Sequence, residues 1–576
     1  MGRLRRTVAL GLAAVLALVG CGHPRGGSVV GGAPSSGTGY SALDPAATGP
    51  APEVPGARRG GTVTVYAQAA PDSFDPTDID DEAAEEIGKL LFRTPTQLTM
   101  RSGRPVLVPD LTDLGTVSAD RLTWTFKLRT AARYADGTPV TVTDLAYAIK
   151  RSFAHDAHPG GPTYQLSYFA GGDTYKGPYT SGDSYPGVAT PDGDTLVIHL
   201  RRPFPDLPFY LSYPLFTPIP PGKDTRELYR NRPLATGPYQ FDTFTPGAGL
   251  TLKRNPYWDP RSDPARHQYP DAWDFRWGGE QVRNQQQVLD SNGADAAALD
   301  YETVDPSLIP RLTGSRASQL VTGDSPCTTV LNLDSRKIPL DVRKAIAMAY
   351  PAGQLARAEG RTGYVAQPAS TIMPPSVPGW RAYPALPNLT GTGDGAPLAA
   401  RDILRAVGRL GFQLSWYYDN TRPVPQRMNE IQADALRAAG FTVTPIGVST
   451  AELRARTSDY DAPVNVGQSP GQWCADWPTG GAWFPVLFQS HSVTDGDSWG
   501  MLRDPALDAQ IDSVAALPAD QRPARWMALD QQIMSRYVLI PRFHDRLAIV
   551  VGTRIGGAEG DSSLAMPLLT NLYLRG

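Results

Sequence analysis

The segment at residues 467–488 constrains the fold most, because it combines dense aromatic residues with residues that break regular structure. Its aromatic residues are Trp473, Trp477, Trp483, Phe484 and Phe488. Three prolines and several glycines exclude a long helix or an alternating strand, so the segment is predicted to be a loop. Aromatic walls around the single acidic residue Asp476 suit a site that encloses an organic ligand and holds its cationic end. A hydrophobic loop that plugs a seam between domains fits the same residues.

Length and charge narrow the class of protein. The chain has 576 residues, more than one hydrophobic core usually supports, so two or three domains are expected. Charged residues make up 19% of the chain, the net charge is −3, and no basic block follows the N-terminus. We therefore expect no nucleic-acid partner.

The N-terminus has the pattern of an export signal. Three arginines in the first six residues precede the apolar run 8–19, which is short for a membrane span. Leu18-Val19-Gly20-Cys21 resembles a bacterial lipobox, which implies a signal peptide at residues 1–20 and a lipid on Cys21. An ordinary cleaved signal with a chance cysteine is the alternative. Residues 21–59 are rich in Gly, Pro, Ser and Ala, and this composition predicts a flexible tether.

Without Cys21, two cysteines remain, Cys327 and Cys474. In an exported protein such a pair is most simply a disulfide. The chain has neither a CxxC motif nor a Cys/His cluster, so no metal site is expected.

Strand and helix patterns alternate along the body. Residues 122–129 and 195–200 alternate apolar and polar side chains, which is typical of half-buried strands. Thr143 is expected to cap a helix at residues 144–153. Residues 237–241 and 249–254 read as a hairpin around Pro246-Gly247. Such alternation predicts an α/β protein.

Several blocks carry a family resemblance. Residues 124–129 (WTFKLR), 134–140 (YADGTPV), 148–152 (AIKRS), 235–239 (ATGPY), 252–258 (LKRNPYW), 327–333 (CTTVLNL), 341–346 (DVRKAI) and 539–544 (LIPRFH) stand in this order. They resemble the solute-binding proteins of peptide-type bacterial ABC importers. The resemblance covers nearly all of the body from Gly60 to the C-terminus.

The resemblance implies a periplasmic-binding-protein type II (cluster C) fold, with two lobes around a hinge and an extra domain inserted in the N-terminal lobe. Lobe I would comprise residues 60–94, 233–326 and 542–576, the inserted domain residues 95–232, and lobe II residues 327–541. The crossings at Cys327 and Pro541 would form the hinge, and the lobes would close on a ligand.

In oligopeptide binders of this family, a Cys-Ala-Asp segment supplies the aspartate that pairs with the peptide's α-ammonium group, and its cysteine bonds to one at the hinge strand. Cys474-Ala475-Asp476 and Cys327 match this pattern, which implies Asp476 as the ligand anchor and a disulfide between Cys327 and Cys474. The following Trp477-Pro478-Thr479-Gly480-Gly481 departs from the family's usual run, so the pocket floor can differ. Further candidate wall residues, each with a core position as its alternative, are Gln68, Phe74, Trp416, Tyr417, Trp473, Trp477, Trp483 and Trp499.

One motif of this chain would favour an enzyme, the GxSxG match at residues 467–471, which is typical of a hydrolase nucleophile. It fails because Pro470, directly after the serine, has no backbone N–H for an oxyanion. We therefore expect no catalysis and no cofactor.

The expected function is that of a monomeric lipoprotein on the outer face of the bacterial cytoplasmic membrane, which captures peptides and delivers them to an ABC permease and its ATPase. The alternatives are a non-peptide solute (nickel chelate, siderophore-like compound, opine or sugar) and a signal-peptide sensor.

Overall fold

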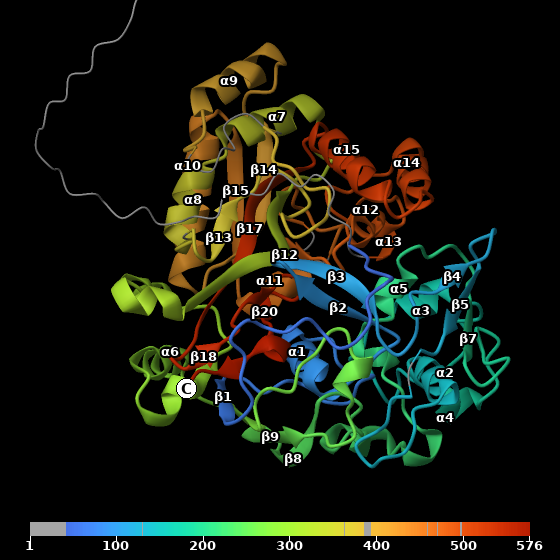
Figure 1. Ribbon diagram of the computed structural model, residues 1–576. Helices are drawn as coiled ribbons and strands as arrows, with labels where there is room; N and C mark the ends of the chain where they lie inside the picture. The colour runs from blue at the N-terminus through green and yellow to red at the C-terminus, as the bar shows by residue number, and fades with distance from the viewer. Residues whose placement is uncertain are drawn as a thin grey trace, which may run out of the picture. The chain divides into compact units, whose positions relative to one another are not determined.

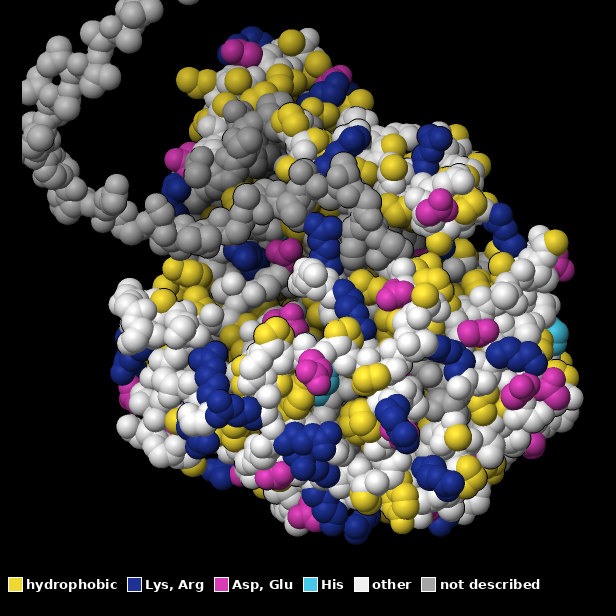
Figure 2. Space-filling view, in the orientation of Figure 1, with side chains coloured by type: hydrophobic (Ala, Val, Ile, Leu, Met, Phe, Trp, Pro, Cys, Tyr) yellow, Lys and Arg dark blue, Asp and Glu magenta, His cyan; other side chains and the backbone are white. Residues whose placement is uncertain are grey.

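The computed structural model describes residues 42–129, 131–361, 363–384, 393–457, 459–468, 471–495 and 498–576. The expected signal peptide, Cys21 and the Ser469-Pro470 pair lie outside the described residues. The fold is mixed α/β, as the alternating patterns predict. Basic and acidic side chains are interspersed over the face drawn in Figure 2, in line with the small net charge of −3.

A five-stranded sheet has the order β11-β1-β10-β9-β8. Its strands are β1 (Thr62–Tyr66), β8 (Tyr239–Thr245), β9 (Gly249–Arg254), β10 (Ala272–Arg276) and β11 (Ala298–Asp300). β1 pairs in parallel with β10 and β11, and β8 and β9 form the predicted antiparallel hairpin. The helices are α1 (Glu82–Leu91) and α6 (Gln281–Asp290). α1 buries Ile87, Leu90 and Leu91 in the core of this sheet.

Residues 96–216 add a hairpin, a second sheet and short helices. The hairpin joins β2 (Thr96–Arg101) to β3 (Arg104–Pro109). The second sheet has the order β4-β5-β7-β6, with β4 (Thr116–Val117), β5 (Thr123–Lys127), β6 (Val188–Ala189) and β7 (Thr195–His199). The helices are α2 (Val142–Arg151), α3 (Tyr164–Tyr168), α4 (Pro178–Ser181), α5 (Leu207–Tyr210) and the 3-10 turn η1 (Pro214–Phe216).

Helix α2 begins two residues earlier than the sequence predicts, because Thr141 and not Thr143 is its N-cap. The Asp144 backbone N–H donates to the Thr141 hydroxyl (3.3 Å), and the Thr141 N–H donates to the Asp144 carboxylate (2.9 Å). This reciprocal capping box satisfies two backbone donors, whereas a cap at Thr143 offers no such partner three residues on.

Two long strands contribute side chains to both of the large hydrophobic cores of the protein. The third sheet has the order β13-β17-β12-β16, with β12 (Leu320–Asn332), β13 (Ala366–Pro368), β16 (Gln472–Cys474) and β17 (Leu539–Val550). β12 and β17 are antiparallel over most of their length. Val321 and Leu547 lie in the core of the β1 sheet, whereas Val330 and Ile540 lie in the second large core. The same two strands therefore contribute to both cores.

The second core is covered by helices around a parallel pair of strands, β14 (Gln413–Asp419) and β15 (Thr442–Val448). The helices are α7 (Leu340–Ala349), α8 (Ala352–Glu359), α9 (Pro397–Ala406), α10 (Pro423–Ala438), α11 (Thr450–Thr457), α12 (Phe484–Phe488), α13 (Ser492–Asp495), α14 (Pro505–Ala515) and α15 (Arg522–Met534). α7, α8, α9 and α10 group around β14 and β15, and α14 lies beside α15 (Figure 1). The last strands are β18 (Ile555–Gly556), β19 (Gly560–Asp561), β20 (Met566–Pro567) and β21 (Tyr573–Leu574).

Residues 42–59 do not behave as the flexible tether expected from their composition. Leu43 pairs with Leu107 of β3, and the Asp44 N–H donates to the Leu107 carbonyl (2.9 Å). Further along, the Val54 N–H donates to the Tyr269 hydroxyl (3.2 Å). The expectation of a flexible tether rested on composition alone, which does not take into account the hydrogen-bond partners that the folded body offers. This stretch therefore follows the protein surface. Within the described residues, none of the helices is both long and apolar enough for a membrane span.

Candidate functional site

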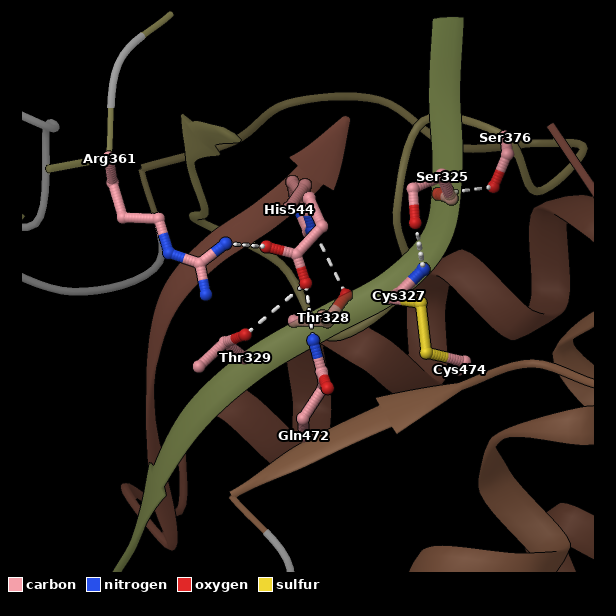
Figure 3. Close-up of a disulfide and its surroundings, with 10 residues drawn as sticks. Ser325, Cys327, Thr328, Thr329, Arg361, Ser376, Gln472, Cys474 and His544 are labelled. Carbon is pink, nitrogen blue, oxygen red and sulfur yellow. Dashed lines mark hydrogen bonds and ion pairs between the residues drawn. A yellow bond between two sulfur atoms is a disulfide. The ribbon is translucent and has the colours of Figure 1, made fainter. Parts of the chain in front are cut away.

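The disulfide between Cys327 and Cys474 is present, which confirms the expected pair. Cys474 ends β16, and Cys327 lies directly opposite it on β12 in the antiparallel register. Figure 3 shows the two cysteines side by side between these strands. In the sheet order, β16 is an outer strand, next to β12. The disulfide therefore fastens an edge strand of the third sheet to the strand that contributes to both cores.

Asp476 lies two residues beyond β16 and is half-buried. Its carboxylate accepts a hydrogen bond from the Tyr164 hydroxyl, and its backbone carbonyl accepts one from the Tyr213 hydroxyl (2.9 Å). Burial raises the pKa of both tyrosines well above the usual value, and the negative charge of Asp476 raises it further. Both hydroxyls therefore stay protonated and act as donors, which fixes the position of Asp476.

The loop after Asp476 is held by Asp206, which directly precedes α5. The Asp206 carboxylate accepts hydrogen bonds from Trp477 Nε1 (3.0 Å) and Thr479 Oγ1 (2.6 Å), and it pairs with the Arg522 guanidinium (2.5 Å). Trp477 also packs on the ring of Tyr164, with the ring centroids 5.0 Å apart. Asp206, Trp477 and most of Arg522 are buried. One carboxylate thus organises the loop that carries Asp476.

Two further carboxylates near Asp476 were not predicted from the sequence. They belong to Asp80 and Glu85. Asp80 precedes Asp81, the N-cap of α1, and Glu85 stands in the first turn of the helix. Both interact electrostatically with Asp476. The acidic run at residues 80–82 is typical of a helix start, so the sequence did not single out these carboxylates.

The structure buries most of the aromatic wall residues expected from the sequence. Trp483 and Trp499 are 0% exposed, and their ring centroids lie 6.2 Å apart. Phe74 packs edge-on against Phe241 and Phe244. The buried candidates, which have almost no surface for a ligand in this conformation, are Phe74, Trp416, Trp477, Trp483 and Trp499. They are core residues, because their apolar rings gain more from packing against each other than from contact with water.

The other three candidates retain accessible surface. Trp473 on β16 is half-buried and donates from Nε1 to the Ala482 carbonyl (2.9 Å). Gln68 is exposed, and its backbone N–H donates to Glu302 (3.1 Å). Tyr417 is half-buried under the Arg456 guanidinium, which lies 5.7 Å from the ring centroid. Of the three, Trp473 shares its chain segment with Asp476.

A cavity of about 550 Å³ adjoins the disulfide, because Cys327 forms part of its lining. Its lining comes from segments far apart in the sequence, among them Thr303, Cys327, Arg361, Gln472 and Asp545. The Asp545 carboxylate accepts a hydrogen bond from the Gln472 side-chain amide (2.5 Å) and pairs with Arg361 (2.9 Å). The cavity at Gln472 and the carboxylate beyond Cys474 thus lie at the two ends of β16.

One set of residues has the composition of a metal site, Asp75, Asp78 and His158. Arg151 takes both carboxylate oxygens of Asp75, at 2.6 and 2.7 Å, and Arg230 lies 3.3 Å from Asp78. These cations already supply the positive charge, so the set is an ion-pair network.

Known structures share this fold. The "Clavulanic acid biosynthesis oligopeptide binding protein 2" superposes with a TM-score of 0.80 at 24% identity, over 92% of this chain and 100% of its own. The Haemophilus influenzae OppA complex with RPPGFSPFR superposes with a TM-score of 0.63 at 16% identity, over 90% of this chain and 99% of its own. The chain therefore has the two-lobed α/β fold of periplasmic binding proteins, which confirms the expected fold class.

The family model for bacterial extracellular solute-binding proteins, family 5 Middle, matches residues 106–494. This chain belongs to that family. It is 23% identical to the periplasmic oligopeptide-binding protein OppA of Salmonella typhimurium, over 78% of this chain and 82% of that protein. It is 22% identical to the glutathione-binding protein GsiB of Escherichia coli O1:K1 / APEC, over 73% of this chain and 78% of that protein.

Proposed function

We propose that this protein captures peptides outside the cytoplasm and delivers them to the permease of an ABC importer. The family is one of solute-binding proteins, and the relatives above are named for oligopeptide or glutathione binding. The neighbouring Haemophilus influenzae structure holds the peptide RPPGFSPFR. A protein with this task binds its ligand and releases it unchanged, so we propose no catalytic step.

The observation that carries the proposal is the position of Asp476, a half-buried carboxylate two residues beyond an edge strand. A carboxylate in such a place gains most from a cationic partner. The α-ammonium group of a peptide is such a partner, and Tyr164 already donates a hydrogen bond that keeps the carboxylate in place. Asp476 is therefore proposed as the anchor for the first residue of the peptide.

The rest of the peptide would lie along β16. An outer strand offers backbone N–H and C=O groups to an extended ligand, which gains affinity from main-chain hydrogen bonds with little dependence on side chains. The cavity at Gln472 lies at the far end of the strand and offers space for later residues. Trp473, between the two ends, remains a candidate contact.

We propose the domain boundaries expected from the resemblance: lobe I at residues 60–94, 233–326 and 542–576, the inserted domain at 95–232, and lobe II at 327–541. The contribution of β12 and β17 to two separate cores supports a hinge in these strands. The boundary residues Cys327 and Pro541 both lie within them.

The proposal also includes the location. Lipid attachment at Cys21 would hold a monomer on the outer face of the bacterial cytoplasmic membrane, within reach of the permease and ATPase subunits. The lipobox-like Leu18-Val19-Gly20-Cys21 supports this attachment.

Native mass spectrometry tests the function. Residues 22–576 are expressed behind a cleavable secretion signal that lacks a lipidation cysteine, purified without added ligand, and then denatured to release what the protein carries. We expect a heterogeneous set of short peptides with free N-termini. A single non-peptide compound would contradict peptide capture and would favour a nickel chelate, siderophore-like compound, opine or sugar as the solute.

A further inference from the structure

The loop at residues 477–481, which departs from the run expected from the family resemblance, is built around a carboxylate from a distant part of the chain. Asp206 accepts two hydrogen bonds from side chains of this loop and pairs with Arg522 (2.5 Å). A Cβ atom placed on Gly481 would lie 2.1 Å from Oδ2 of Asp206. Such a contact is far too short, so position 481 has to be glycine while Asp206 is in place. The unusual loop sequence therefore fits the presence of Asp206.

These contacts cross the proposed boundary between the inserted domain and lobe II. Asp206 belongs to the inserted domain, whereas the loop and Arg522 belong to lobe II. Two rings of the inserted domain, Tyr164 and Tyr210, pack on Trp477 of the loop, with ring centroids 5.0 and 6.2 Å apart. Asp206 and Trp477 are both 2% exposed. Separation of the inserted domain from lobe II would therefore break a buried ion pair and expose a packed aromatic cluster.

The inserted domain is also fastened to lobe I, by buried ion pairs at two places. Asp110 of the inserted domain pairs with Arg93 (2.7 Å) and Arg266 (2.9 Å) of lobe I. Arg151 of the inserted domain pairs with Asp75 of lobe I (2.6 Å). All five side chains are at most 1% exposed. Because the chain also crosses twice between these two parts, opening at the hinge strands would break the contacts of Asp206 and leave these pairs intact.

We propose that Asp206 and residues 477–481 form a latch, which holds the inserted domain against lobe II before a peptide binds. All groups of the latch belong to this chain, so the latch forms without a ligand. Asp206 also positions Asp476, because the latched loop follows Asp476 directly. A peptide then reaches Asp476 only when the latch opens transiently. This inference rests on the lobe boundaries and the anchor of the proposed function, and it adds the step that limits capture.

The distance between two spin labels tests the latch without any peptide. The labels are attached at Gly193→Cys in the inserted domain and Ala509→Cys in lobe II, two exposed positions. We expect a single short distance in the ligand-free protein. Asp206→Ala should lower the ratio of closed to open molecules about 100-fold, the effect of removing one partner of a buried pair, so that a longer distance becomes detectable.

Gly481→Ala tests the same contact from the other side and keeps both charges of the ion pair. The φ angle of Gly481 is not positive, so the backbone accepts alanine and the obstacle is the contact with Asp206. This variant should also open. In the Asp206→Ala background it should have little further effect, because both changes remove the same contact. Gly222→Ala is the matched control and should keep the wild-type distance, since no atom lies within 4 Å of a Cβ atom there.

Stopped-flow binding of Ala-Ala-Ala-Ala adds a kinetic measurement that a purely structural role of Asp206 would not affect. In the wild type the observed association rate should level off at high peptide concentration, because opening limits capture. In Asp206→Ala it should rise linearly. A linear rise in the wild type would contradict the latch.

Two results of the distance measurement would overturn the latch. One is a long distance already present in the ligand-free wild type. The other is the same distance distribution in the wild type, Asp206→Ala and Gly481→Ala. Absence of peptide binding by all of these proteins would instead contradict peptide capture, because the distances are measured without a peptide.

Discussion

Substitution of Asp206 by asparagine removes the charge that pairs with Arg522 and keeps the shape of the side chain. Asp206 is 2% exposed, and its ion pair with Arg522 measures 2.5 Å. Loss of one partner of a buried pair costs about 3–5 kcal/mol, because the other charge stays buried without compensation. Arg522 keeps 12% of its side-chain surface, so the low end applies. We therefore expect the free energy of unfolding to fall by about 3 kcal/mol.

Urea unfolding followed by tryptophan fluorescence measures this change. Asp434→Asn is the matched control, because the Asp434–Arg437 pair is 3.1 Å long but lies on the surface, with side chains 77% and 52% exposed. Such a pair contributes less than about 1 kcal/mol. The double variant Asp206→Asn/Arg522→Gln should recover part of the loss, since no charge is left unpaired. Equal stability of Asp206→Asn and Asp434→Asn would refute the reasoning.

Two further predictions concern the third sheet. His544 on β17 is buried and its pKa is lowered to about 3. An unfolded histidine titrates near 6.5, so the neutral ring stabilises the fold above that pH, and the contribution is lost as the pH falls toward 3. Relative to His544→Gln, the wild type should therefore lose about 2 kcal/mol between pH 6.5 and 5 in urea unfolding, and parallel pH profiles would argue against this. The Cys327–Cys474 bond joins residues 147 positions apart, so it restricts the unfolded chain strongly. The double variant Cys327→Ser/Cys474→Ser should therefore lower the free energy of unfolding by up to about 5 kcal/mol. An unchanged urea midpoint would contradict this estimate of the loop-closure entropy.

Much of the secondary structure was predictable from local sequence patterns. The alternating residues of β5 and β7 and the hairpin β8–β9 were predictable, because period-two patterning and turn residues act over a few positions. The boundary of α2 was not, since two threonines compete for the cap and only the reciprocal bond with Asp144 decides between them. The disulfide was predictable from the count of cysteines and from the family resemblance.

The site was less predictable, because its decisive contacts join distant residues. Tyr164 reaches Asp476 over 312 positions, and Asp206 reaches Trp477 over 271. Neither tyrosine nor aspartate carries a sequence signal for such a partner. The burial of Trp477 and Trp483 was not predictable for a related reason: residue type indicates an apolar environment, but it does not distinguish a pocket wall from a core.

The most direct test of the account is calorimetric titration of Ala-Ala-Ala-Ala and its N-acetylated form against the wild type and Asp476→Asn. Loss of the charge-assisted contact should weaken binding of the free peptide to the variant by about 1.5–3 kcal/mol, roughly 10- to 150-fold. Acetylation should weaken binding to the wild type by a similar factor but have little further effect on the variant, because both changes remove the same contact. If Asp476→Asn binds the free peptide as tightly as the wild type does, Asp476 is not the anchor of the ligand.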